Sequence, residues 1–362
     1  MKSVSPRIIT EPNKNTLLEM SSNGNKNSSS SSRSRTAIGI IGGSGPEAGM
    51  DLFGRVLAAH RRRLGDRYRS DRDAPDLLLW NVPGVGGPRT EIDVTPGTAG
   101  GTYEASLEAL EGAMLALAPL VGVLCIACHT LHVFVPAILE AHRDTILPSA
   151  PSAGCSGSSS SGAAVGAGPS VGTTRFVSIV DVTVRACRAR LARRNRDTAG
   201  RIPDDEGFRI AILGGPATMD LLGRSPYKRV LDELGEDSVY IPPASAIDVV
   251  KTIIWQIKRD GRVPNTSGDT NNNDDDEEEG TAGAALRDYY RLLREMASEH
   301  RVGIFVLACT ELPLIPTDDR HMGGDTTGSS GNATTGAVEF IDPTELVAEA
   351  VLDATHPCPV ED

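Results

Sequence analysis

The 362-residue sequence has no apolar run close to the roughly 18 residues that cross a membrane, and no apolar N-terminal segment typical of a signal peptide. Cysteine is scarce, and the six cysteines are too widely spaced for a disulfide scaffold, which indicates reduced thiols. Lysine and arginine are outnumbered by acids, and the net charge of −12 argues against a nucleic-acid surface. We therefore expect a cytoplasmic protein with neither a membrane nor a nucleic acid as its partner.

Four polar stretches hold too few apolar residues to build a core. Residues 1–35 include a serine-rich run and predict a disordered tail. Residues 148–174, about 263–280 and 319–337 predict low-complexity insertions, the second of which carries six consecutive acids. The folded part of the chain is expected in the segments between them.

Strand and helix patterns alternate along these segments. Short apolar runs that predict buried parallel strands lie at residues 37–41, 77–82, 121–127, 176–180, 208–213, 239–241 and 302–308. Helical patterns lie between them, at residues 47–64, 102–117, 244–258 and 284–299. This alternation predicts an α/β protein with doubly wound parallel sheets and with its site at the carboxyl ends of strands.

Two halves of the chain resemble each other. Residues 121–128 (VGVLCIAC) are matched by residues 302–309 (VGIFVLAC), and the run 38–43 is echoed by 210–215. Both Cys128 and Cys309 therefore follow an equivalent strand. A duplicated α/β unit, with two similar domains related by a pseudo-two-fold axis, places one thiol on each side of the cleft between them. Proton removal from one face of a substrate and return to the other needs such a pair, so both cysteines are predicted to be catalytic.

A glycine-rich turn at residues 42–48 follows the first strand and opens a helix. It partly matches a dinucleotide fingerprint, but the acid expected at the end of the second strand is instead Asp76 at its beginning. The pattern favours a turn whose backbone N–H groups, near Gly43 and Ser44, hold an anion at a helix N-terminus. No cofactor is predicted.

The segment around the first predicted catalytic cysteine also resembles two kinds of cofactor site. Cys125, Cys128 and His129 match a haem-attachment string, which here lies in an apolar strand. A metal cluster that adds His132 is an alternative, but Cys125 and Cys128 point to opposite faces of an extended strand. We therefore predict no metal site and take Cys125 as a buried apolar residue.

The sequence resembles the aspartate/glutamate racemase superfamily, the cofactor-independent two-cysteine racemases, and is most similar to the aspartate racemase branch. Thr310-Glu311-Leu312 after the second cysteine fits that branch better than the Cys-Thr-His of glutamate racemases. The resemblance covers about residues 36–147, 175–261 and 282–356. The segments that carry it are residues 38–48, Asn81-Val82-Pro83 with Pro88-Arg89-Thr90, residues 128–132, residues 308–314 and residues 340–343.

This resemblance implies two similar α/β domains, with the last helix returning to the first domain. The implied organisation is a first domain of residues 36–147 plus 338–356 and a second domain of residues 175–318. It also implies racemisation of a small acidic amino acid, aspartate or glutamate, between Cys128 and Cys309 without a cofactor. A homodimer is an assembly that the sequence leaves open.

The substrate contacts follow from the same resemblance. Arg89 and Lys258 would anchor carboxylates, and the turn at Gly43 and Ser44 would stabilise the charge that develops on the substrate, together with Thr130 and Thr310. His129 stands where the family commonly has an asparagine that holds the substrate carboxylate, and it is expected to take over that contact.

Two alternatives remain open at this point. One is a relative with another reaction, such as a hydantoin racemase, a maleate isomerase or a malonate decarboxylase, although a decarboxylase would be favoured by the loss of one cysteine. The other is a non-catalytic amino-acid-binding protein on the same scaffold.

Overall fold

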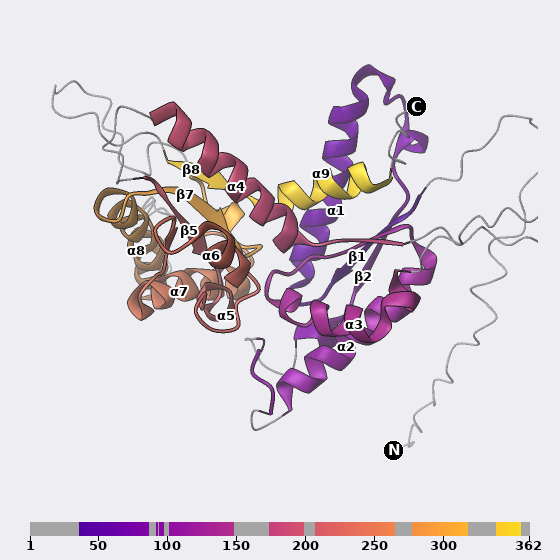
Figure 1. Cartoon of the computed structure of the whole chain (residues 1–362), viewed down its shortest axis with the longest axis horizontal. Coiled ribbons are helices and arrows are strands. Elements are labelled where there is room, and N and C mark those ends of the chain that lie inside the picture. Colours follow the sequence, from indigo (N-terminus) through magenta and orange to yellow (C-terminus); the bar gives the residue numbers. More distant parts are fainter. Residues whose placement is uncertain are drawn as a thin grey trace, which may run out of the picture. The chain divides into compact units, whose positions relative to one another are not determined.

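A computed structural model describes residues 36–86, 92, 94–97, 101–147, 174–198, 207–264, 277–317 and 338–355. Strands and helices alternate through these residues (Figure 1). The strands are β1 (Ile38–Gly42), β2 (Leu77–Asn81), β3 (Val123–Ile126), β4 (Arg175–Val177), β5 (Arg209–Leu213), β6 (Val239–Tyr240), β7 (Val302–Leu307) and β8 (Glu339–Ile341). The α-helices are α1 (Pro46–Leu64), α2 (Thr102–Leu117), α3 (Val135–Ile146), α4 (Ile179–Thr198), α5 (Pro216–Met219), α6 (Lys228–Leu234), α7 (Ala244–Asp260), α8 (Glu277–Glu299) and α9 (Pro343–Thr355). The 3-10 turns are η2 (Gly65–Arg67), η3 (Asp71–Asp73), η4 (Pro83–Gly86), η5 (Ala118–Leu120), η6 (Thr130–Val133) and η7 (Leu312–Leu314).

The strands form two parallel sheets with the same internal order. The first runs β2-β1-β3-β4 and the second runs β6-β5-β7-β8, so each strand of the second sheet has a counterpart in the first. We call each sheet, with the helices packed on it, a lobe. The predicted fold class, an α/β protein with two similar doubly wound parallel sheets, is confirmed, and Cys128 and Cys309 each lie two residues beyond the equivalent strands β3 and β7.

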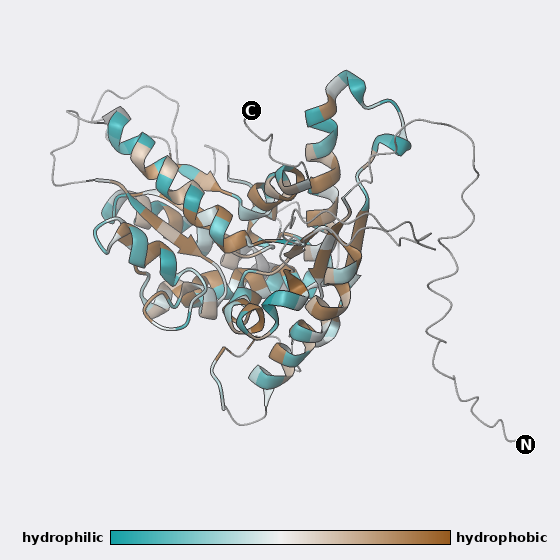
Figure 2. Cartoon of the chain, turned by 45° about the vertical axis from the view of Figure 1, so that its right-hand side comes forward, coloured by the Kyte–Doolittle hydropathy of each residue, from teal (hydrophilic) through white to brown (hydrophobic). Residues whose placement is uncertain are grey.

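Helices cover both faces of each sheet because successive strand residues point to opposite sides. In β3, Val123 and Cys125 pack in a core with α1, α4 and α9, whereas Leu124 and Ile126 pack in a core with α2 and α3. The second sheet has α7 and α8 on one face, while its other face adds Ile212 to the core of α4 and α9. The strands and the inner faces of the helices are accordingly apolar (Figure 2). Cys125 is fully buried, as expected.

Two strands belong to the opposite lobe from the one predicted. The run 176–180 was expected to be a strand of the second domain, but β4 pairs with β3 in the first sheet. The chain then turns into α4, because the Ser178 hydroxyl accepts a hydrogen bond from the Asp181 N–H at 3.1 Å and caps the new helix. β8 was expected in the first domain, but it pairs with β7 in the second sheet, where Phe340 stacks on Phe305.

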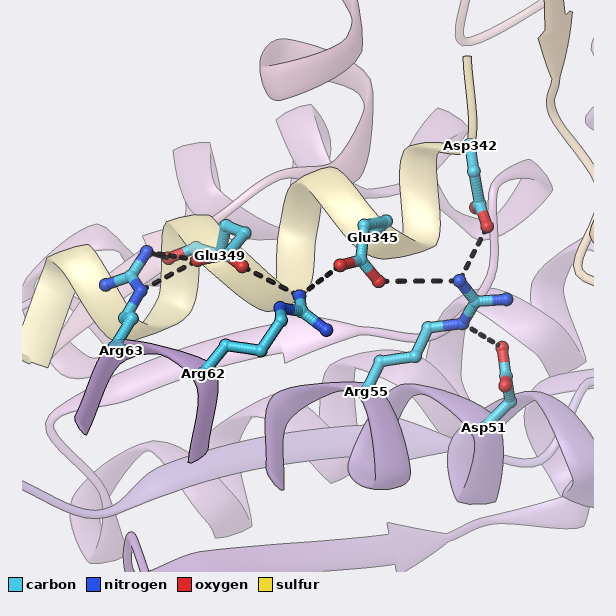
Figure 3. A network of polar contacts seen from close by, with 7 residues as sticks. All are labelled: Asp51, Arg55, Arg62, Arg63, Asp342, Glu345 and Glu349. Carbon is cyan, nitrogen blue, oxygen red and sulfur yellow. Dashed lines mark hydrogen bonds and ion pairs between the residues drawn. The ribbon is translucent and has the colours of Figure 1, made fainter. Parts of the chain in front are cut away.

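After β8 the chain crosses to the first lobe, where α9 packs against α1 (Figure 1). An ion-pair network holds these helices together (Figure 3). The Arg55 guanidinium lies 2.7 Å from both Asp51 and Asp342 and 3.5 Å from Glu345. Asp342 also accepts a hydrogen bond from the Thr344 N–H at 2.9 Å, so one carboxylate caps α9 and binds α1. Arg62 and Arg63 extend the network to Glu345 and Glu349.

The predicted tail at 1–35 and most of the three predicted insertions lie outside the described residues. In the part of the chain that the structure describes, no helix combines the length and the apolar character that crossing a membrane requires.

Candidate active site

A cavity of about 310 Å³ lies where β3 and β7 end, and residues of both lobes line it. Ala127 and Ala308 both line the cavity. Their positions are equivalent, since the N–H of Ala127 donates to the Ile41 carbonyl near the end of β1 and that of Ala308 donates to the Leu213 carbonyl at the end of β5. Seven of the nine predicted site residues line this cavity, namely Ser44, Cys128, His129, Thr130, Lys258, Cys309 and Thr310.

Both candidate catalytic cysteines are free and partly exposed. Cys309 donates a hydrogen bond from its Sγ to Oε2 of Glu311 at 2.9 Å, and the Thr310 hydroxyl donates to the same oxygen at 3.0 Å. Burial raises the pKa of the Cys309 thiol well above its ordinary value, and the negative charge of Glu311 raises it further, whereas Lys258 opposes this shift. Cys309 is therefore a protonated thiol in this arrangement, and it has a carboxylate in contact to which its proton can pass.

Lys258 supplies the positive charge of the cavity. Its Nζ lies 3.6 Å from Oε1 of Glu311, and no other lysine or arginine lines the cavity among the described residues. Burial lowers the pKa of Lys258, but electrostatic interactions with Cys309, Glu311 and Cys128 together outweigh that effect and leave the pKa above its ordinary value. The ammonium group is therefore positioned to stabilise a thiolate on either cysteine.

The glycine-rich turn meets the cavity through Ser44 and not through Gly43, which was predicted to bind substrate. Gly43 has a φ of 124°, and a Cβ there would lie 2.1 Å from the Val82 carbonyl oxygen. Its role in the structure is to let the chain turn against Val82. A Cβ on Gly45 would lie 3.7 Å from Oε1 of Glu311, so this turn of the first lobe faces the carboxylate of the second.

His129 lies at the cavity wall, and its ring also contacts the second lobe. The residue is 3% exposed, and its Nδ1 is hydrogen bonded to the Tyr227 hydroxyl at 2.7 Å. Nε2 is buried from solvent, with no partner among the described residues. Burial, with a smaller contribution from His132, lowers the pKa of His129 to about 3, so the ring is neutral and carries no charge for a carboxylate.

The side chains considered for a metal cluster point in different directions. Cys125 is in the core with its Sγ 3.6 Å from the Gly39 carbonyl, and His132 bonds through Nδ1 to the Cys128 carbonyl at 2.8 Å. Within the described ranges, the three potential ligands that do converge are Glu295, Glu299 and His300 at the end of α8, and none of them lines the cavity.

Arg89, the other predicted carboxylate anchor, lies outside the described residues. Sequence reasoning missed Glu311 as a site residue, although it lies inside the segment that carries the family resemblance. It also missed the apolar part of the wall, which comprises Ile92, Val94, Ile254 and Trp255. Only the strand-end position of Glu311 could have revealed its role, since it follows Cys309 by two residues.

These observations define a class of two-lobed α/β proteins with one thiol at the end of the same strand in each lobe. No family model matches the sequence, and no protein of curated function matches it. The fold is that of the Asp/Glu racemases. A solved Yersinia pestis structure assigned to that group matches with a TM-score of 0.51 and 16% identity, over 88% of this chain and 99% of its own. An aspartate racemase homologue from Pyrococcus horikoshii gives a TM-score of 0.49 at 16% identity, again over 88% and 99% of the two chains.

Proposed function

We propose that the protein is a cofactor-independent racemase of an acidic amino acid, with aspartate as the first candidate and glutamate as the second. The observation that carries this proposal is that Cys128 and Cys309, at equivalent strand ends of two lobes, line one cavity. A substrate between them exposes one face of its Cα to each thiol.

The reaction moves one proton at each face. A thiolate removes the proton from Cα, the electron pair of the C–H bond passes toward the substrate carboxylate, and the opposite thiol delivers its own proton to the other face. Cys309, protonated and in contact with Glu311, is the donor when Cys128 is the base. The reverse reaction starts from the state that this leaves, with Cys309 as the thiolate base and Cys128 as the protonated donor. When both thiols are protonated, Cys309 reaches that state by passing its proton to Glu311.

Lys258 and the hydroxyl groups of the wall support this chemistry. The Lys258 ammonium interacts with both thiols, so it offsets the negative charge whichever cysteine is the thiolate. Ser44, Thr130 and Thr310 line the same cavity and are the donors for the charge that develops on the substrate carboxylate. Arg89 is proposed as the second carboxylate anchor, and together these cations favour an acidic substrate.

The apolar wall supports a second candidate. Ile92, Val94, Ile254 and Trp255 line the cavity together with a single described cation, a combination that also suits a larger neutral substrate of the kind that a hydantoin racemase takes. The thiol chemistry would be the same in that case.

The test is incubation of the full chain in deuterated water with each enantiomer of aspartate, glutamate, a neutral amino acid and a substituted hydantoin. We expect aspartate to gain deuterium at Cα and to appear as both enantiomers by chiral chromatography. Racemisation of only the neutral compounds would establish the second candidate. Aspartate that binds without any exchange would show that the protein is a binding protein.

The cysteine variants test the two-base mechanism. Cys128→Ser and Cys309→Ser should each abolish racemisation, while exchange of the α-proton on one face can survive. Cys358→Ala, which alters a cysteine beyond the end of α9, is the control and should racemise at the wild-type rate. Full racemisation by either serine variant would contradict the mechanism.

A further inference from the structure

His129 and Tyr227 connect the two lobes next to the candidate catalytic Cys128. His129 follows Cys128 directly and precedes η6 in the first lobe, whereas Tyr227 precedes α6 in the second. Tyr227 is fully buried, and its hydroxyl lies 2.7 Å from Nδ1 of His129. This contact is therefore shielded from water, which would otherwise compete for both groups.

The same two chain segments meet a second time. The Thr130 hydroxyl lies 3.2 Å from the Thr218 hydroxyl of α5. The Thr218 carbonyl in turn accepts a hydrogen bond from Ser225, whose oxygen accepts one from the Tyr227 N–H at 3.0 Å. Four hydrogen bonds and the peptide bond between His129 and Thr130 thus close a ring, the interlobe cluster, of His129, Thr130, Thr218, Ser225 and Tyr227. All of these residues except Thr130 are buried.

We propose that His129 and Tyr227 are positioning residues that fix the Cys128 turn against the second lobe and so set the placement of Cys128 relative to Cys309. This inference rests on the proposed two-thiol reaction, which needs both sulfur atoms within reach of one Cα. A buried ring that closes through two contacts holds a turn in one orientation, whereas one hydrogen bond would leave it free to rotate.

The chemistry of the two side chains fits a positioning role. A neutral imidazole that is hydrogen bonded to a phenol brings no charge near the Cys128 sulfur. Lys258 is then the described cation that interacts electrostatically with the thiols. The contact uses Nδ1, which is bonded to Cγ, so an asparagine amide at position 129 would place an oxygen or nitrogen at a similar distance from Cα. A side chain without a polar atom at that position is needed to remove the contact.

The variants for the test are Tyr227→Phe, His129→Leu and the double variant, with Tyr289→Phe as the control. Tyr289 is also a fully buried tyrosine, but its hydroxyl has no partner among the described residues, so this change deletes a hydroxyl without breaking a contact. Circular dichroism verifies that each variant is folded.

We expect each single change in the cluster to lower kcat for the substrate about two- to tenfold while KM stays within about twofold. The double variant should be no slower than the slower single variant, because both changes remove the same contact. Additive losses in the double variant, or a rise in KM at constant kcat in His129→Leu, would overturn the proposal and make His129 a substrate contact.

A second readout does not depend on activity. The rate of iodoacetamide labelling at Cys128, followed by peptide mass spectrometry, should rise at least about twofold in Tyr227→Phe, while labelling at Cys309 and in Tyr289→Phe stays unchanged. Equal labelling of Cys128 in all variants would overturn the proposal. If the wild-type chain racemises nothing, the proposed function fails, and this labelling alone decides whether the interlobe cluster holds the Cys128 turn.

Discussion

Cys309 and Glu311 form a thiol–carboxylate pair, with Sγ 2.9 Å from Oε2 and the carboxylate 8% exposed. Thr130 occupies the corresponding position in the first lobe, two residues after Cys128, and its hydroxyl meets Thr218 instead of the thiol. Both lobes therefore contain the cysteine, but the residue two positions later contacts the thiol only in the second lobe. Among the described residues, Cys309 has a carboxylate as its proton partner and Cys128 does not.

Glu311→Gln tests this difference. The variant removes the acceptor for the Cys309 proton, and we expect racemisation to fall about a hundredfold or more in both directions, since the equilibrium constant ties them together. The same change removes a charge that raises the pKa of Cys309, so alkylation of Cys309 should shift to lower pH. Faster alkylation with slower racemisation is the expected signature, measured by peptide mass spectrometry and chiral chromatography. Unchanged racemisation would exclude Glu311 from the proton path.

Lys258→Met should act on the same thiol with the opposite sign. Lys258 lowers the pKa of Cys309 against the larger effect of burial, so its loss raises that pKa and slows alkylation at any fixed pH. Racemisation should fall as well, because no described cation remains beside the thiols. Lys228→Met is a matched control, since Lys228 pairs with Asp232 on an exposed face of α6. Alkylation of Cys309 that is as fast in Lys258→Met as in the control would contradict this account.

The network between α1 and α9 predicts a stability difference between two arginines (Figure 3). Arg55 is half-buried between Asp51 and Asp342, so Arg55→Met leaves carboxylates without their partner and should lower the free energy of unfolding by about 1.5–3 kcal/mol. Arg62→Met removes exposed ion pairs and should change it little. Urea denaturation followed by circular dichroism compares the two. Equal losses would show that the burial of Arg55 has no energetic consequence.

His132 predicts a dependence of stability on pH. Burial lowers the pKa of His132 in the folded state to about 4, against an unfolded value of about 6.5. The folded state therefore stays neutral while the unfolded chain takes up a proton, and the stability from this group is complete above about pH 6.5 and is lost as the pH falls toward 4. His132→Gln should reduce the slope of the free energy of unfolding between about pH 4.5 and 6 by up to about 1.4 kcal/mol per pH unit. Urea titrations across that range measure the slope, and an unchanged slope would mean that His132 is protonated in the folded state.

The sequence allowed the fold class to be predicted because its signals are local. Short apolar runs identified seven of the eight strands, at least in part, and the Ala-Cys repeat placed both thiols at strand ends. The sheet membership of β4 and β8 was not predictable in this way. Each has three residues, and only pairing with a partner far along the chain decides to which sheet so short a strand belongs.

The site was predictable where it depends on strand ends and not where it depends on contacts between lobes. Cys128 and Cys309, which follow the ends of β3 and β7, line one cavity. His129 was expected to bind a substrate carboxylate, and its ring is hydrogen bonded to the Tyr227 hydroxyl. No local sequence pattern around either residue predicts that contact. α8 begins at Glu277 instead of the expected 284.

The exchange of β8 and α9 between lobes has a consequence for the repeat. Asp342 alone separates a strand that completes the second sheet from a helix that covers the first. A cut between α4 and β5 would separate α9 from the first sheet and α4 from the second. Each fragment would therefore lack part of its own core, and neither would be an autonomous folding unit. The two repeats that the sequence suggests therefore fold as one unit. The two fragments would have to associate, as in fragment complementation, for either to fold.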